Sequence, residues 1–139
     1  MQFDPENNVV KLCAQGMAAE GEPEKARLYF QQAWNEATTN FERFIAAHYV
    51  ARQQPAIADK LKWDETSLEL ALTVQDEQMQ EVYPSLYLNI GKGYEDLGDF
   101  DTARNHYRLA ESFAINLPED GYSTMIRNGI RNGLDRVGE

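Results

Sequence analysis

The sequence contains the same pattern twice, at a constant separation of 77 residues. Residues 17–30 read MAAEGEPEKARLYF, and residues 94–107 read YEDLGDFDTARNHY. In both stretches an Ala follows five residues after the Gly of a Gly–acid pair, and an aromatic side chain follows four residues later. The match extends over eight residue pairs without a gap. It therefore indicates an internal repeat, which constrains the fold more than any other feature of the chain.

The spacing within each copy predicts two antiparallel helices. Before the Gly, packing residues recur at helical intervals, at Val10, Cys13, Ala14 and Met17 in the first copy and at Tyr87, Ile90, Gly91 and Tyr94 in the second. The two turn glycines, Gly21 and Gly98, are expected to end these helices with positive φ. A second stripe then follows, made of Ala26, Phe30 and Ala33 or of Ala103, Tyr107 and Ala110. Small residues at the crossing, with Ala14 matched to Gly91, allow the helices to approach closely.

This combination of residues resembles the tetratricopeptide repeat (TPR), a unit of about 34 residues. The stretch YLNIGKGYEDLGDFDTARNHYRLAESFAINLP matches the pattern closely, with Tyr87 where a tryptophan is usual. The first copy, about residues 7–40, is a weaker match because Val10 replaces the usual aromatic residue. The resemblance implies an all-α fold, in which antiparallel helix pairs stack into a right-handed α-solenoid.

A separation of 77 residues leaves room for one further unit of about 34 residues plus about nine more. We expect this irregular unit over residues 41–77. The segment NFERFIAAHYVARQQ supplies its first helix, with packing positions at Phe44, Ala47, His48 and Ala51. The segment LKWDETSLELALTV supplies the second, with Asp64, Leu68 and Ala71 along the stripe. Longer connections are expected near Pro55 and between Gln75 and Tyr83.

The third unit is expected over about residues 84–117, and a turn at Pro118 and Gly121 follows it. Beyond the turn, Ser123 is a candidate N-cap. A helical stripe then runs through Ile126, Ile130, Leu134 and Val137. We interpret residues 122–137 as a helix that caps the open end of the stack. Residues 1–139 are therefore predicted to form a single TPR-like domain of about seven helices.

The composition disfavours several classes of function. A net charge of -10 and a pI near 4.6 argue against a nucleic-acid partner, because phosphate contacts need a basic surface. The single cysteine, Cys13, cannot form an internal disulfide. The segment MQFDPENNVV lacks the basic and apolar regions of a signal peptide, and no apolar run reaches the length of about 18 residues that spans a membrane. We therefore expect a cytoplasmic protein without membrane contact.

The sequence provides no catalytic constellation, and we expect no metal and no cofactor. Cys13 lies on the apolar stripe of the first helix, without an evident base beside it. His48 and His106 are not at metal-ligand spacing. We interpret His48 as a packing residue and His106 as a surface residue. The GKG segment at residues 91–93 lacks the spacing of a phosphate-binding loop.

The segment RNGIRNG at residues 127–133 allows two interpretations. Gly129 and Gly133 share one helix face, and each costs about 1 kcal/mol relative to Ala. Close packing of the capping helix would compensate for this cost. Alternatively, Arg127 and Arg131 form a basic ridge for a carboxylate or phosphate group.

In the TPR family, the first helix of each pair lines the concave groove, and the resemblance places the candidate site there. The candidate partner-binding residues are Lys11, Gln15, Ile45, Tyr49, Arg52, Leu88, Asn89 and Lys92. Lys11, Arg52 and Lys92 would place positive charge inside an acidic chain. Ile45, Tyr49 and Leu88 would provide apolar contacts. This mixture suits a peptide that carries an acidic group.

The known TPR clamp for a chaperone's C-terminal carboxylate is not expected here, since Asp96 and Phe100 occupy its two basic positions in the last unit. The leading hypothesis is a non-enzymatic module that binds a protein or peptide segment in its groove. One alternative is a self-assembly element that forms a homodimer without a separate ligand. An enzyme or a sensor of a small ligand is the third possibility.

Overall fold

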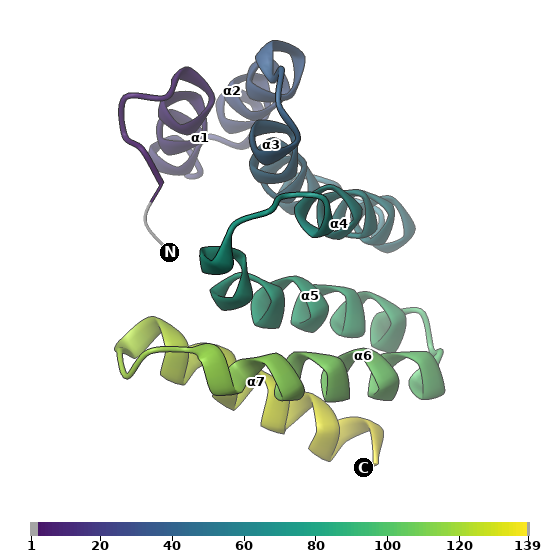
Figure 1. The fold of residues 1–139 in the computed structure, drawn as a ribbon. Helices are drawn as coiled ribbons and strands as arrows, with labels where there is room; N and C mark the ends of the chain where they lie inside the picture. Colours follow the sequence, from purple (N-terminus) through teal and green to yellow (C-terminus); the bar gives the residue numbers. More distant parts are fainter. Residues whose placement is uncertain (1–2, 139) are drawn as a thin grey trace. The chain divides into compact units, whose positions relative to one another are not determined.

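The computed structural model describes residues 3–138, which form α-helices and short 3-10 helices and contain no strand. The α-helices are α1 (Asn8–Ala18), α2 (Pro23–Glu36), α3 (Asn40–Arg52), α4 (Ile57–Leu72), α5 (Tyr83–Asp96), α6 (Phe100–Phe113) and α7 (Gly121–Val137). The 3-10 helices are η1 (Glu77–Glu81) and η2 (Ala114–Asn116). The predicted all-α class and the number of helices in this part of the chain are confirmed (Figure 1).

The chain divides into two compact units. One comprises α1 to α4, up to Gln75, and the other begins at Asp76 and contains η1, α5, α6, η2 and α7. We describe each unit by itself and refer to them as the N-terminal unit and the C-terminal unit. The longer connections expected near Pro55 and after Gln75 lie where helices are interrupted, and the second of them contains η1.

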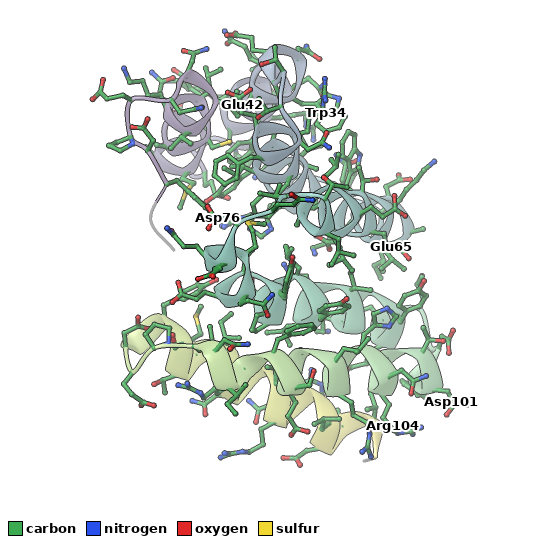
Figure 2. The ribbon with its side chains drawn as sticks, viewed as in Figure 1. Trp34, Glu42, Glu65, Asp76, Asp101 and Arg104 are labelled. Carbon is green, nitrogen blue, oxygen red and sulfur yellow. The ribbon has the colours of Figure 1, made fainter. Side chains whose placement is uncertain are left out.

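The boundaries of several helices follow from side chains that satisfy free backbone groups. At the start of α3, the Glu42 amide donates to Oγ1 of Thr39 at 3.1 Å, and the Glu42 carboxylate accepts from the Thr39 amide at 3.2 Å. This is a capping box. Glu42 is labelled in Figure 2. Hydrogen bonds from the Thr38 amide, the Asn7 side chain and the Thr39 amide lower the pKa of Glu42 to about 2.

The helix ends beside the turn glycines are built differently in the two copies. Gly98 has a φ of 86°, and the Asp99 amide donates to the Tyr94 carbonyl at 2.9 Å, which closes α5 as expected. Gly21 is not among the described glycines with positive φ, so this expectation was wrong for the first copy. There α1 ends three residues before its Gly, one residue earlier than α5 does, and the Glu22 amide donates to the Ala19 carbonyl at 2.8 Å.

The core of the C-terminal unit is organised around one aromatic ring. Tyr107 on α6 is 0% exposed and lies between two helix backbones. A Cβ atom built on Gly91 of α5 would approach Cδ1 of this ring to 2.7 Å, and one built on Gly133 of α7 would approach Cζ to 2.6 Å. Neither approach is possible for a residue with a side chain unless the ring moves. The two glycines therefore allow α5 and α7 to pack closely against Tyr107.

Polar contacts at the edge of the same ring connect these helices further. The Tyr107 hydroxyl donates to Oε1 of Glu95 on α5 at 2.7 Å. Arg136 on α7 donates to both oxygens of the same carboxylate, at 2.8 and 3.1 Å. Arg104 on α6 donates to the carbonyl oxygen of Val137 at 2.8 Å, where α7 ends (Figure 2). The two arginines therefore hold the C-terminal end of α7 against α5 and α6.

The N-terminal unit repeats the aromatic–glycine contact with a shifted register. Phe30 on α2 is fully buried, and a Cβ on Gly16 of α1 would collide with its ring. Gly16, not Ala14, is thus the counterpart of Gly91, and these two glycines are 75 positions apart. The predicted equivalence of Ala14 with Gly91 was wrong, because Ala14 is exposed.

This shift changes which face of α1 is buried. The buried residues of the helix are Val9, Leu12, Cys13 and Gly16. Met17, which the repeat pattern placed at a packing position, is 45% exposed, and Val10 is half-buried. The prediction that Cys13 belongs to the core is confirmed by its burial.

The irregular helix pair departs from the repeat pattern at its centre. Ala71 and Asp64 are buried along the predicted stripe of α4, but Leu68 is only half-buried. Ser67 is fully buried instead and donates to the backbone carbonyl of Phe44 on α3 at 2.9 Å. A small hydroxyl residue that is anchored on the opposite backbone thus takes the place of the large side chain at this crossing. Lys60 donates to the buried Asp64 carboxylate at 2.6 Å.

The same packing relation between three consecutive helices occurs once in each unit. In the N-terminal unit, α3 contacts both α2 and α1. In the C-terminal unit, α7 contacts both α6 and α5, and Figure 1 shows α7 running beside α6. The second ring face of Phe30 is covered by Tyr49 of α3, with ring centres 5.2 Å apart. Tyr107 is covered in the corresponding way by Gly133 of α7.

Helix α7 itself follows the predicted stripe, since Ile126, Ile130, Leu134 and Val137 are all buried. Its N-cap is Asp120, whose side chain accepts from the Ser123 amide at 2.7 Å. The expectation that Ser123 caps the helix was therefore wrong. Ser123 lies inside the first turn and is fully buried.

The contact of Tyr107 with the glycines predicts a difference between two substitutions on α7. Gly133→Ala should lower the free energy of unfolding by about 1–3 kcal/mol, because the new methyl group meets a fully buried ring. Gly129→Ala should be nearly neutral, since its Cβ would meet only the flexible end of Leu88 at 3.0 Å and the helix gains about 1 kcal/mol of propensity. Urea unfolding followed by circular dichroism measures both, and equal losses would contradict this account.

Candidate functional site

Four of the predicted partner-binding residues lie on two contacting helices of the N-terminal unit. Lys11 and Gln15 are exposed on α1, and Tyr49 and Arg52 lie on α3. Because α1 contacts α3 directly, these side chains belong to one structural unit. We call these four residues the α1–α3 surface.

Each cation of the α1–α3 surface has an acidic neighbour. Lys11 Nζ lies 3.4 Å from Oε2 of Glu6, and Nη2 of Arg52 lies 2.9 Å from Oε1 of Glu20. The side chains of Lys11 and Arg52 remain 53% and 44% exposed. Exposed ion pairs of this kind are worth about 0–1 kcal/mol, so an incoming carboxylate can compete for either cation.

The aromatic member of the surface supports its neighbouring cation. The guanidinium carbon of Arg52 lies 5.8 Å from the centre of the Tyr49 ring, within the range of a cation–π contact. Tyr49 is half-buried and stacks on Phe30, which belongs to the core. The position of Arg52 is therefore connected to the aromatic packing of the unit.

Gln15 borders a small hollow between the end of α1 and the start of α2. The hollow has a volume of about 240 Å³, and it is also lined by Ala18, Glu22, Lys25 and Tyr29. It adds a recess next to Gln15, which lies one turn along α1 from Lys11. Ile45, by contrast, was expected to provide an exposed apolar contact and is only 3% exposed. That expectation was wrong because α3 buries residues on more than one side.

The predicted residues of the C-terminal unit lie on α5, where α7 packs. Leu88 is half-buried and meets Gly129 of α7. Asn89 is half-buried, and Lys92 is exposed and forms an ion pair with Asp96 one turn along α5. The expectation that Leu88 offers a free apolar contact was wrong, because the chain's own capping helix occupies that side.

Contacts that the sequence did not reveal involve residues distant in the chain. Glu20 pairs with Arg52, 32 positions away, and Glu95 pairs with Arg136, 41 positions away. The pKa of Glu95 is lowered, chiefly by its hydrogen bond from Arg136. No local pattern marks these carboxylates, since their partners are selected only when the helices pack.

The two arginines of the RNGIRNG segment have different environments. Arg127 donates to the backbone carbonyl of Leu117 at 2.9 Å and lies 3.9 Å from Glu119, so it braces the turn before α7. Arg131 is exposed, and it makes no hydrogen bond or ion pair within residues 3–138. The close-packing interpretation of Gly133 and Gly129 agrees with their contacts to Tyr107 and Leu88.

The titratable core residues do not form a reactive group. Burial raises the pKa of the Cys13 thiol to about 12, which disfavours the nucleophilic thiolate. Burial also lowers the pKa of His48 to about 4, with smaller contributions from the charges of Arg52 and Lys60. Within residues 3–138, no group of three or more His, Cys, Asp or Glu side chains is placed to hold a metal ion. His106 is half-buried, its Nδ1 2.9 Å from the Thr102 carbonyl oxygen.

Comparisons with family models, with curated proteins and with solved structures find no match for this chain. Among the described residues, no helix combines the length and the apolar character needed to cross a bilayer.

The environment of His48 predicts a pH dependence of stability. Its imidazole is kept neutral in the folded chain, and Nδ1 is buried without a hydrogen-bond partner. The unfolded chain protonates this group near pH 6.5, whereas the folded chain does so near pH 4. The stabilising contribution of neutral His48 is therefore present above pH 6.5 and is lost as the pH falls toward 4. Within this window, each fall of one pH unit should lower the folding equilibrium constant by up to about tenfold.

Urea unfolding of the wild type and of His48→Gln between pH 4 and pH 7.5 measures this effect. Because the carboxylates titrate in both proteins, their contribution cancels in the difference between the two free energies of unfolding. The difference in stability between the two proteins should grow with pH up to about 6.5 and then stay constant. A pH-independent difference would contradict the assignment. An NMR titration of the His48 ring checks the folded-state pKa directly.

Proposed function

We propose that this chain is a non-enzymatic TPR-like module, which uses the α1–α3 surface to bind a protein or peptide segment that carries an acidic group. The proposal includes antiparallel helix pairs in a right-handed stack. It differs from the sequence-based hypothesis in the extent of the site, because the residues that carry it lie within the N-terminal unit.

The TPR-like character is supported by two recurring contacts. An aromatic ring of the second helix packs on a glycine of the first helix in both units, as Phe30 does on Gly16 and Tyr107 on Gly91. A third helix then packs on both members of the pair, α3 in one unit and α7 in the other. Such a relation between successive helices is what a stack of repeats requires.

The single observation that carries the binding proposal is the assembly of Lys11, Gln15, Tyr49 and Arg52 on two contacting helices. Two exposed cations and an aromatic ring supply the contacts that an acidic side chain and its apolar neighbours need. On a chain with a net charge of -10, an acidic segment is attracted to Lys11 and Arg52 once it displaces the carboxylates of Glu6 and Glu20 from them.

A non-enzymatic role is favoured over an enzymatic one by the condition of the nucleophile candidate. Cys13 is buried and its thiol pKa is raised, so it is not poised to attack a substrate. The α1–α3 surface itself contains cations, an amide and a phenol ring, a set that serves recognition.

The proposal predicts the behaviour of a charge-reversal variant. Lys11→Glu combined with Arg52→Glu should reduce binding to acidic peptides by about tenfold or more, because carboxylates replace both cations. The wild-type chain is first screened on an array of peptides with varied acidic and apolar positions. The affinity of the best peptides for wild type and variant is then measured by fluorescence polarisation.

Arg27→Glu with Lys62→Glu is the matched control, since both residues are exposed elsewhere in the same unit and the net charge changes equally. This control should retain the affinity, and circular dichroism should show unchanged helicity for both double variants. The proposal is rejected if Lys11→Glu with Arg52→Glu binds the peptides as tightly as wild type, or if the control loses as much affinity.

A further inference from the structure

We infer that a hollow between α6, η2 and α7 is the contact surface of a homodimer. In this dimer Ile115 of each copy enters the hollow of the other, and Arg131 of each copy pairs with Glu111 of the other. The surface lies within the C-terminal unit and shares no residue with the α1–α3 surface. Its test is therefore independent of the proposed peptide binding.

The hollow has an apolar base and a charged rim. Its volume is about 480 Å³, within the range of about 300–1,000 Å³ that is typical of binding pockets. Ala114, Ile130 and Leu134 form the base, and Glu111, Ile115 and Arg131 are exposed at the rim. The hollow is thus large enough to admit an apolar side chain from another molecule.

Ile115 is the most exposed large apolar residue among those described, at 85%. A single exposed apolar side chain is ordinary, but this one is held in place. The Leu117 amide donates to the Ala114 carbonyl at 3.1 Å, and Arg127 of α7 donates to the Leu117 carbonyl at 2.9 Å. The short helix η2 therefore presents Ile115 in a fixed position at the edge of the hollow.

The charges at the rim are of both signs and have no partner within the described residues. Glu111 and Arg131 line the same hollow, yet neither forms an ion pair with any side chain of residues 3–138. Arg127 also lines the hollow and pairs with Glu119, so the charges at this region balance locally on a chain whose net charge is -10. Two acidic copies repel one another least where such a region is in contact.

These features favour a second copy of the chain as the occupant. A two-fold interface brings the same surface together with itself, so that surface must contain both members of each complementary pair. Here one protruding apolar side chain adjoins one hollow, and one unpaired carboxylate adjoins one unpaired guanidinium. An unrelated acidic partner would explain Arg131 but would leave Glu111 and Ile115 without a role.

The small size of the surface predicts a weak dimer, at the low end of the range for specific interfaces. Sedimentation velocity of the full chain, from about 1 µM to about 1 mM, should show a reversible monomer–dimer equilibrium in the micromolar to millimolar range. Ile115→Asp should raise the dimer Kd by at least about tenfold. Leu109→Asp is its control, because Leu109 is also exposed on α6 but does not line the hollow, and it should leave the Kd unchanged.

Charge reversal gives a more specific test. Glu111→Arg alone and Arg131→Glu alone should each weaken self-association at least about tenfold, since like charges then face each other across the two-fold axis. An equimolar mixture of these two variants should form a heterodimer, because each contact again joins opposite charges. The double variant E111R/R131E should self-associate as the wild type does, and Arg108→Glu, which is exposed on α6 but does not line the hollow, should have little effect.

Circular dichroism of every variant excludes a loss of fold as the cause of dissociation. A wild-type chain that stays monomeric over the whole concentration range would overturn the inference. So would a dimer that survives Ile115→Asp, or single charge variants whose mixture does not associate. If the chain is monomeric and Arg131→Glu abolishes binding of the acidic peptides instead, the hollow takes a separate partner and the homodimer is rejected.

Discussion

The close approach of an aromatic ring to a glycine backbone is the contact on which each unit of this protein depends. Tyr107 fills the space between α5 and α7 because Gly91 and Gly133 have no Cβ atoms to displace it, and Phe30 meets Gly16 in the same way. A glycine inside a helix costs about 1 kcal/mol relative to alanine. The burial of a whole aromatic ring offsets this cost, since a fully buried aromatic side chain contributes more than that from apolar area alone.

The same contact determines where a binding surface can exist. Once α7 packs on Tyr107, it also covers Leu88, and Arg136 binds the Glu95 carboxylate. The face of α5 that the repeat pattern would leave open is thereby used for internal packing. In the N-terminal unit, Tyr49 of α3 covers Phe30 with its ring, while Arg52 and the α1 residues Lys11 and Gln15 keep much of their side chains exposed. The third helix of a unit can therefore either cover the first helix or leave part of it exposed for recognition, and the two units differ in this respect.

The candidate cations of the described chain differ in whether a carboxylate lies beside them. Carboxylates outnumber cations by ten, and the cations Lys11, Arg52 and Lys92 are each placed within reach of one carboxylate. These exposed pairs contribute little to stability, and a stronger acidic ligand can replace the intramolecular partner. Arg131 is different because no carboxylate of residues 3–138 reaches it, and it therefore marks the second surface.

Much of the fold could be predicted from the sequence because it depends on local spacing. Intervals of three and four residues mark the Ala and aromatic positions of α2 and α6 and the apolar stripe of α7. The turn after α5 is marked by Gly98. The register of α1 could not be predicted in this way. The apolar residues of α1 occupy two faces of the helix. The buried face is the one that contains Gly16, because only a residue without a Cβ atom can approach the Phe30 ring so closely. Ser67 displaced Leu68 for a similar reason, since its hydroxyl reaches the Phe44 carbonyl across the helix crossing.

The helical class, the number of helices and the Ala and aromatic positions on α2 and α6 could be predicted from the sequence alone, because periodicity and turn chemistry are properties of adjacent residues. Only the tertiary structure decided which polar side chains meet, as Glu20 meets Arg52 and Glu95 meets Arg136, and which candidate residues stay exposed. Burial and ion pairing depend on the distances between helices. Those distances are set by the side chains that pack at each helix crossing, and the spacing of residues along the sequence does not specify them.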